Sequence, residues 1–259
     1  MKTNKKRFLV VGDLHTKYDV FLNATKEFEE GNFDKIVFLG DYCDDWQASP
    51  YASLNLLTSL IDFKKQYGDK CILLLGNHDL SQWMGNEFAC SGFNQTTHIF
   101  VSPFFRENEN LFQIAYSYKD YLFTHAGVCS SWLRDISLLS ERFKNLKTAK
   151  EISEHLNLSL SEMSKDQEYQ SLFKALTQCG FYRGGFEHPS PIWADKQELI
   201  SNPCPKINQI VGHTPVNTLT IHKIRNGDKS DSYIFFCDTC SKRVDGKDIG
   251  DRSFLRIYL

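Results

Sequence analysis

The sequence predicts an α/β fold in which two mixed β-sheets pack as a sandwich with helices on the outer faces. Short apolar runs alternate with longer amphipathic segments in the first third of the chain, and four further apolar runs follow in the last third. A length of 259 residues suffices for a substantial core. Since no repeat, low-complexity tract or Pro/Gly-rich linker divides the chain, we expect one domain over residues 1–259.

The first third alternates predicted strands with predicted helices. The strands are RFLVVG (7–12), KIVFLG (35–40) and CILLLG (71–76), and the helices between them span residues 18–30 and 50–67. A β-α-β-α-β order implies parallel strands joined by right-handed crossovers.

The middle of the chain changes character. LFQIAYSY (111–118) and YLFTHAG (121–127) are predicted to pair as neighbouring strands. About residues 130–180 are polar and rich in Leu, Lys and Glu without a strand pattern, which predicts a helical insertion.

The last third returns to strands, predicted over residues 207–213, 217–224, 232–238 and 254–259. Asn226-Gly227 lies between the second and third of these runs and is a hairpin turn signal.

Composition excludes several classes of protein. The formal net charge of -2 gives no basic field for nucleic acid. Apolar runs stay short of the ~18 residues of a membrane span and, at the N-terminus, of the roughly 7–15 of a secretory signal. The eight cysteines form no clustered framework, and the single Cys-x-x-Cys, Cys237 to Cys240, lacks the second pair of a zinc site. We therefore expect a cytoplasmic protein with reduced thiols and no membrane partner.

Five of the apolar runs end in polar clusters, which read GDLH, GDYCDD, GNHD, THAG and VGHT. Ligands of open α/β sheets bind outside the carboxyl ends of the strands, so the clusters are expected to meet at one crevice. Their candidate ligands are Asp13, His15, Asp41, Asn77, His125 and His213, with His78 beside them. Each cluster alone is also typical of a helix cap, a turn or a structural histidine, but five of the same kind favour a site.

The mixture of carboxylate, carboxamide and imidazole suits Mn, Fe or Zn rather than a thiolate site. Six protein ligands exceed what one ion with an open position takes. Two ions about 3.5–4 Å apart that share one carboxylate fit the number better, and such a pair suits in-line displacement at phosphorus.

The five motifs, in this order, resemble the successive motifs of the calcineurin-like metallophosphoesterases. The THAG and VGHTP forms are most similar to the phosphoprotein phosphatase and diadenosine-tetraphosphatase branch. The resemblance spans about residues 8–240. It implies a metallophosphoesterase-like sandwich and a dinuclear metal-dependent phosphoric ester hydrolase, with Mn²⁺ as the expected ion and Fe or Zn as alternatives.

The resemblance also implies a role for each matching position. Asp13 and His15 would hold one ion, Asp41 would bridge both, and the second ion would be held by Asn77, His125 and His213. A hydroxide between the ions would attack phosphorus directly. His78 matches the general acid that protonates the leaving oxygen, and Asp44 matches the carboxylate that orients it.

One position departs from the phosphatase pattern. Where that branch has a phosphate-binding arginine after the aspartate, this chain has Asp45. Arg183 in FYRGG is the candidate replacement, since flanking glycines would let its guanidinium reach the site; a structural arginine in a glycine turn is the alternative. The segment Trp193–Asp195, which resembles a phosphatase Trp-Ser-Asp, favours Arg183, and Arg106 is the second candidate. The histidines that match no motif, expected to be structural, are His98, His155, His188 and His222.

The leading functional prediction is hydrolysis of phosphate monoesters on a protein or small molecule. The alternative enzymatic function is hydrolysis of dinucleoside polyphosphates. Two non-enzymatic alternatives are a metal-bearing interaction module without turnover and a metal-free nucleotide-binding domain. The substrate pocket is expected to involve Trp46, residues 84–118 and the helical insertion. The sequence carries no signal for an oligomeric state.

Overall fold

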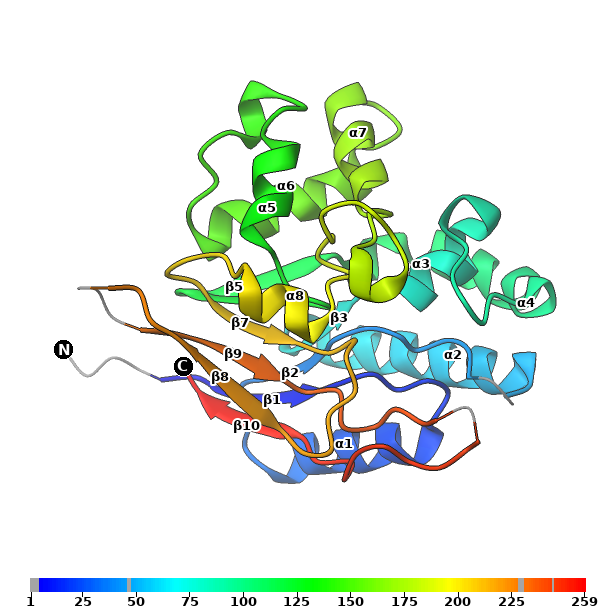
Figure 1. Cartoon of the computed structure of the whole chain (residues 1–259). Coiled ribbons are helices and arrows are strands. Elements are labelled where there is room, and N and C mark those ends of the chain that lie inside the picture. The colour runs from blue at the N-terminus through cyan, green and yellow to red at the C-terminus, as the bar shows by residue number, and fades with distance from the viewer. Residues whose placement is uncertain (1–4, 46–47, 228–230, 244) are drawn as a thin grey trace. The chain divides into compact units, whose positions relative to one another are not determined.

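The computed structural model describes residues 5–45, 48–227, 231–243 and 245–259. Within these residues the chain forms two compact units, whose elements are labelled in Figure 1. The first unit contains residues 1–112, 215–219 and 237–259, and the second contains residues 113–214 and 220–236. Trp46, expected to contribute to the substrate pocket, lies outside the described residues.

The parallel core of the first unit follows the predicted β-α-β-α-β order. β1 (Arg7–Val11), β2 (Lys35–Phe38) and β3 (Cys71–Leu74) lie side by side and parallel. They are connected by α1 (Tyr18–Glu30) and α2 (Pro50–Tyr67). Nearly every residue of the three strands is buried, as expected of parallel strands covered on both faces.

Two further strands extend this sheet, whose order is β10-β1-β2-β3-β4. β10 (Leu255–Tyr258) is antiparallel to β1, which makes the sheet mixed. The other elements are η1 (Gly68–Lys70), α3 (Asn77–Met84), η2 (Gly85–Phe88), α4 (Gln95–Glu107), η3 (Glu109–Leu111) and β4 (Phe112–Gln113).

The second sheet has the order β5-β6-β7-β9-β8. β5 (Ala115–Tyr118) pairs antiparallel with β6 (Tyr121–Thr124), as the sequence predicts. β6, β7 (Asn208–Val211) and β9 (Ser232–Phe236) are parallel neighbours, and β8 (Thr220–Ile224) pairs antiparallel with β9. The last pairing is the one that Asn226-Gly227 indicated, although residues 228–230 of the connection lie outside the described residues.

One predicted strand is wrong. The apolar run 111–118 is not continuous, because Phe112 and Gln113 belong to the first sheet whereas Ala115 begins a strand of the second. Ile114 between them is fully buried, so the hydrophobic pattern continues across the break and hides it.

Helices gather on the second unit within the stretch predicted to be helical. They are α5 (Ser130–Ile136), η4 (Glu141–Phe143), α6 (Ala149–Ser161) and α7 (Gln167–Ala175), followed by η5 (Phe181–Arg183) and α8 (Lys196–Ser201). In Figure 1, α5, α6 and α7 lie on one side of β5. Trp132 of α5 is fully buried, and its indole N–H donates to the carbonyl of Ala175 at 3.2 Å, which fastens α5 to α7.

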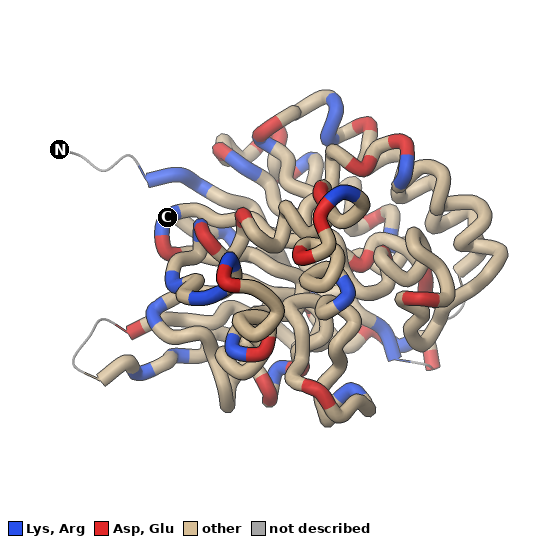
Figure 2. Tube along the Cα trace, turned by 90° about the horizontal axis from the view of Figure 1, so that it is seen from above, with Lys and Arg blue, Asp and Glu red and all other residues tan. Residues whose placement is uncertain are grey.

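The predicted fold class is confirmed: two five-stranded mixed sheets with helices build an α/β protein. None of the helices in the described ranges is long and apolar enough to span a bilayer. Figure 2 shows Lys and Arg interspersed with Asp and Glu along the visible trace, in keeping with the small net charge.

Candidate metal and catalytic site

The first unit gathers the polar clusters that follow its three parallel strands. Because β1, β2 and β3 are parallel neighbours, their carboxyl ends lie at the same edge of the sheet. Asp13, Asp41 and Asn77, one from each strand end, are all buried. These three predicted metal ligands therefore lie at the same edge of the first sheet.

Asp13, His15 and Asp41 form a compact group whose potential ligand atoms lie within 4.8 Å of one another. The Nε2 atom of His15 is 4.0 Å from Oδ2 of Asp13 and 3.8 Å from Oδ2 of Asp41. Two atoms that each bind one ion at about 2.1 Å lie roughly 3–4 Å apart, so this spacing fits a metal ion held by all three side chains.

The tautomer of His15 also suits metal binding. Its Nδ1 lies 3.0 Å from the carbonyl oxygen of Asp44, which can only accept, so Nδ1 carries the proton. Nε2 is then left with a lone pair on the side of the two carboxylates. Burial lowers the pKa of His15, partly offset by the Asp41 carboxylate, and this favours the neutral ring that binds metals.

Asp41 is held by the loop that follows β3. Its Oδ1 accepts the backbone N–H of His78 at 3.0 Å, at the N-terminus of α3, where the helix dipole favours a negative charge. A Cβ at Gly76 would lie 2.1 Å from that same Oδ1. The glycine of GNHD is therefore required so that the carboxylate of Asp41 can approach the chain.

Asp79, the last residue of GNHD, is a functional-site residue that the sequence reasoning missed. Its buried carboxylate accepts four backbone N–H groups, from Asp41 (2.7 Å), Gly76 (3.0 Å), Tyr42 (2.8 Å) and Cys43 (3.3 Å). It therefore ties the loop after β2 to the loop after β3. The sequence signal that could have identified Asp79 is its position in the GNHD motif.

Replacing Asp79 by leucine is expected to lower the free energy of unfolding by more than about 3 kcal/mol, because hydrogen bonds to a charged group contribute about 1.5–3 kcal/mol each. Urea denaturation of the metal-free protein measures the loss. Asp62→Leu, on an exposed position of α2, is the matched control and should change stability little. Equal stabilities of the two variants would contradict the role of Asp79.

His78 and Asp44 form a contact pair beside this group. The Nδ1 of His78 lies 2.7 Å from Oδ1 of Asp44, and the other Asp44 oxygen accepts an amide N–H of Gln82 at 3.0 Å. Gln82 is fully buried on α3, one turn beyond His78, and was not identified from the sequence. The carboxylate of Asp44 is thus fixed by Gln82 while it orients His78.

The environment of His78 keeps its imidazole protonated. Burial alone would lower its pKa, but the carboxylates of Asp41 and Asp44 outweigh it and raise the pKa well above the ordinary value. About a fifth of the side chain remains exposed, so the ring can reach solvent or a bound molecule. A protonated, oriented and accessible imidazole has the properties of a general acid.

The second unit brings together the two remaining histidines. His125 follows β6 and His213 follows β7, and these strands are parallel neighbours. Both side chains are buried, and Nε2 of His125 lies 3.1 Å from Nδ1 of His213. Two imidazole nitrogens at this separation match adjacent ligands of one ion.

Arg183 lies beside His213 in the second unit. Its Nη2 donates to the hydroxyl of Thr214 (3.0 Å) and the carbonyl of His213 (3.4 Å), and it pairs with Asp195 at 3.2 Å. The Arg183 side chain as a whole is about a quarter exposed. The ring of Trp193 packs edge-on against His213 with centroids 5.9 Å apart. The FYRGG and WAD segments thus both surround the VGHT loop.

Several candidate residues adopt a backbone conformation that non-glycine residues avoid. Asp44 (φ 57°) and three predicted metal ligands, His15 (φ 41°), Asp41 (φ 54°) and His213 (φ 62°), lie in the left-handed region. Such conformations cost about 1–3 kcal/mol each and cluster at functional sites. Their coincidence with the predicted ligands supports a functional reading of the strand ends.

The position that departs from the phosphatase pattern has a cationic neighbour. Asp45 acts electrostatically on the buried Lys17: burial lowers the pKa of this lysine, and the Asp45 carboxylate opposes the shift. Arg106, the second candidate for phosphate binding, bonds to Ser102 within its own helix α4.

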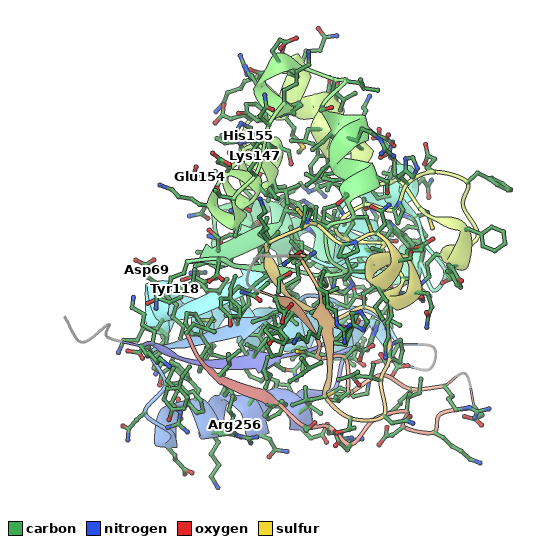
Figure 3. All side chains as sticks on the ribbon, turned by 60° about the vertical axis from the view of Figure 1, so that its left-hand side comes forward. Asp69, Tyr118, Lys147, Glu154, His155 and Arg256 are labelled. Atoms are coloured by element: carbon green, nitrogen blue, oxygen red, sulfur yellow. The ribbon has the colours of Figure 1, made fainter. Side chains whose placement is uncertain are left out.

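The histidines outside the motifs have local partners. His98 contacts the carbonyl of Gln82 at 2.8 Å, and His188 pairs with Asp135 at 2.6 Å. Figure 3 shows His155 on α6 near Lys147 and Glu154, and His222 lies on β8, at one edge of the second sheet. His98 thus lies next to the residue that holds Asp44, whereas none of the four histidines belongs to the groups of potential metal ligands in the described residues.

The Cys-x-x-Cys segment belongs to the first unit as a buried turn. Asp238, between the cysteines, accepts the hydroxyl of Ser241 at 2.7 Å and the backbone N–H of Ser241 at 3.2 Å. Burial raises the pKa of Cys240 to about 11, so its thiol stays protonated at neutral pH. The surroundings of these cysteines are therefore typical of unreactive, structural thiols.

Comparison with known proteins was informative at the level of family and fold. A search of curated proteins finds no match. Among solved structures, a cold-active protein-tyrosine phosphatase of a psychrophilic Shewanella species has a TM-score of 0.51 at 18% identity, covering 97% of this chain and 77% of that one. A mutant of a cold-active protein tyrosine phosphatase has a TM-score of 0.54 at 17% identity, with the same coverage. At such identities the likeness concerns the fold alone.

The family comparison covers most of the chain. Residues 6–232 match the family model described as calcineurin-like phosphoesterase. The matched range contains every one of the predicted ligands and both members of the His78–Asp44 pair. The chain therefore belongs to the calcineurin-like phosphoesterase family.

Proposed function

We propose that this protein is a dinuclear metal-dependent phosphatase that hydrolyses phosphate monoesters. The observation that carries the proposal is the group of Asp13, His15 and Asp41 with the His78–Asp44 pair next to it in the first unit. The group offers a place for a cation, and the pair offers a proton for a leaving oxygen. Family membership supports metal-dependent phosphoester chemistry.

The proposal assigns the predicted ligands to two ions. Asp13 and His15 would hold one, Asn77, His125 and His213 the other, and Asp41 would serve both. When bound, the metals would polarise the phosphoryl group and lower the pKa of a bound water toward neutrality. Mixed oxygen and imidazole donors favour Mn²⁺, with Fe or Zn as alternatives.

His78 would act on the leaving group. An alkoxide leaves poorly from phosphorus unless it is protonated, and the raised pKa of His78 keeps that proton available at neutral pH. Asp44 holds the ring through Nδ1, so Nε2 is the atom that would donate. Gln82 in turn keeps the carboxylate of Asp44 in place.

Arg183 would bind the substrate phosphate in place of the arginine that Asp45 replaces. Support comes from its position: the guanidinium is tied to the loop that carries His213, while the Arg183 side chain is partly exposed. A planar guanidinium can contact two phosphate oxygens at once.

Arg183→Ala is expected to raise KM for phosphate monoesters by about tenfold or more, since charge-assisted hydrogen bonds contribute about 1.5–3 kcal/mol. Arg183→Lys should recover only part of the loss, because an ammonium lacks the bidentate geometry. Steady-state kinetics measure both. Arg142→Ala, an ion-paired arginine of the same unit, is the control. Unchanged KM in Arg183→Ala would make it a structural arginine of the glycine turn.

The proposed activity is tested with p-nitrophenyl phosphate and a phosphoserine peptide, with Mn²⁺, Fe²⁺ or Zn²⁺ added, together with metal analysis of the protein. We expect turnover that a chelator abolishes and Mn²⁺ restores, with two ions per chain. Two bound ions without turnover on either substrate would instead indicate an interaction module. The absence of bound metal after reconstitution would indicate a nucleotide-binding domain, and turnover of diadenosine tetraphosphate alone would indicate the dinucleoside polyphosphatase reading.

The compartment belongs to the proposal as well. All eight cysteines are free, five of them with thiols buried deeply enough that their pKa is raised to about 11 or higher. Free thiols are typical of a reducing environment such as the cytoplasm.

A further inference from the structure

An aromatic turn projects from the second unit next to Arg183. Phe181, Tyr182 and Phe186 are 78%, 61% and 98% exposed, and they account for three of the six exposed large aromatic side chains in the described residues. Single exposed apolar residues are ordinary on a protein surface, whereas a cluster on one short segment marks an interaction site. We call Phe181, Tyr182 and Phe186 the aromatic turn.

The aromatic turn is braced rather than loose. The backbone N–H of Gly185 donates to the carbonyl of Gly180 at 3.0 Å, and that of Glu187 donates to the carbonyl of Cys179 at 3.2 Å. Within it, the N–H of Tyr182 donates to the carboxylate of Glu198 on α8 at 3.2 Å. A Cβ at Gly185 would lie 1.9 Å from the carbonyl of Cys179, so the close crossing of the chain requires glycine.

This rigidity has a consequence for binding. Holding three aromatic rings in water gives up apolar burial, and a braced backbone prevents them from folding inward. A partner that covers them loses little conformational entropy in the process, since the turn is already ordered. Aromatic side chains on a preorganised loop are typical of recognition surfaces.

The aromatic turn is physically connected to the proposed phosphate-binding group. Arg183 belongs to the same 3-10 turn, η5, as Phe181 and Tyr182, and its guanidinium is anchored to His213 and Thr214. A phosphate held by Arg183 would therefore place the groups attached to that phosphate within reach of the rings. The apolar surface is thus positioned for the remainder of the substrate.

The surrounding charges narrow the choice of occupant. His188 pairs with Asp135 of α5, and this helix is followed by the exposed Leu138, which is 80% exposed. Glu187 follows Phe186 directly in the chain, and Asp135 pairs with the nearby His188, so the turn has acidic groups close to it, whereas a surface that inserts into membranes carries basic ones. Arg183 supplies the positive charge for a single phosphate, and the exposed rings supply apolar surface beside it, so the segment fits a polypeptide that carries one phosphate and apolar side chains.

We propose that the aromatic turn binds the apolar residues that flank the phosphorylated residue of a phosphopeptide, so that the substrate class is a phosphoprotein with apolar neighbours of the phosphosite. This inference rests on the proposed function, which it refines. It makes Phe181, Tyr182 and Phe186 determinants of specificity rather than catalytic residues.

The test compares two phosphoserine peptides of equal length and charge, one with leucines flanking the phosphoserine and one with serines. We expect wild-type protein with Mn²⁺ to prefer the leucine peptide by about tenfold in kcat/KM, because a few aromatic side chains account for most of the binding energy of an interface. The double variant Phe181→Ser/Phe186→Ser should lose this preference. Ile221→Ser, which removes an exposed aliphatic side chain from β8 of the same unit, should retain it.

A binding measurement makes the test independent of turnover. Fluorescence anisotropy with the labelled leucine peptide, in metal-free protein, should show weaker binding to the double variant than to wild type and Ile221→Ser. Equal hydrolysis of both peptides by wild type, or a preference that survives in the double variant, would overturn the inference while leaving the phosphatase intact. No hydrolysis of either peptide or of p-nitrophenyl phosphate would overturn the proposed function itself.

Three other outcomes would assign the aromatic turn to another occupant and so overturn the inference. They are a rise in KM for diadenosine tetraphosphate alone in the double variant, binding of wild type but not of the double variant to anionic vesicles, and a dimer in size-exclusion chromatography that the double variant loses.

Discussion

Asp41→Asn is expected to remove both metal ions and, with them, the phosphatase activity. The carboxylate of Asp41 already accepts a hydrogen bond from the N–H of His78 through Oδ1 and faces His15 through Oδ2, so both oxygens are committed to the site. An asparagine has one oxygen and no charge. Residues that only orient metal ligands change metal affinity by about 10- to 100-fold when they are replaced, and a ligand shared by two ions should matter more.

Metal content after dialysis against a defined Mn²⁺ concentration measures the effect, alongside turnover of p-nitrophenyl phosphate. Asp62→Asn makes the same chemical change on an exposed face of α2 and should keep both ions and full activity. Loss of one ion with retention of the other would refute the bridging role of Asp41. Retention of both would remove Asp41 from the ligand set.

His78→Asn is expected to reduce kcat by about 10²–10⁴-fold for an alkyl phosphate, the range typical of general acid catalysis. The loss should be much smaller for p-nitrophenyl phosphate, because p-nitrophenolate is a stable anion that leaves without a proton. Kinetics of the variant on phosphoserine and p-nitrophenyl phosphate, with metal content measured in parallel, separate the two effects. Equal losses on both substrates would indicate that His78 serves metal or phosphate binding instead.

The same pair predicts the direction of a pH effect. Before metal binding, the Asp41 and Asp44 carboxylates outweigh burial and raise the pKa of His78. Ions held by Asp41 would offset its charge, whereas Asp44 stays in contact with the ring. The acid is active below the pKa of His78, so activity is lost as the pH rises through it. Asp44→Asn removes one of the two charges and lowers the pKa of His78. The alkaline limb of the kcat profile should therefore move to lower pH, whereas a limb that stays in place would assign it to another group. His155→Gln, which changes a histidine of α6 in the second unit, is the control.

Much of the fold followed from local patterns. The three parallel strands of the first unit are continuous apolar runs, each preceding a glycine and a polar cluster, and runs of this kind remain recognisable because both faces are buried. The prediction of one continuous strand over residues 111–118 was wrong because burial on both faces also hides a break between two strands. A change from one sheet to another leaves residues such as Ile114 fully buried, so it produces no polar residue in the pattern.

The candidate site, too, was only partly predictable from the sequence. Strand-end position and residue type were enough to name Asp13, His15, Asp41, Asn77, His125 and His213 as candidate ligands. The supporting residues Asp79 and Gln82 were not found. A carboxylate that accepts four backbone N–H groups, or an amide that holds a carboxylate, resembles any other polar residue of a helix until the chain segments around it are placed.

The sequence by itself determined the β-α-β-α-β arrangement of the first third, the α/β class and the identity of the chemically capable side chains, because hydrophobic period and motif spacing are properties of the chain as written. Only the tertiary structure decided which nitrogen of His15 carries the proton, why residue 76 has no side chain, and that three aromatic rings stand in water beside Arg183. Each of these depends on atoms contributed by segments distant in sequence, whose approach is set by packing and backbone hydrogen bonding and leaves no local periodicity to read.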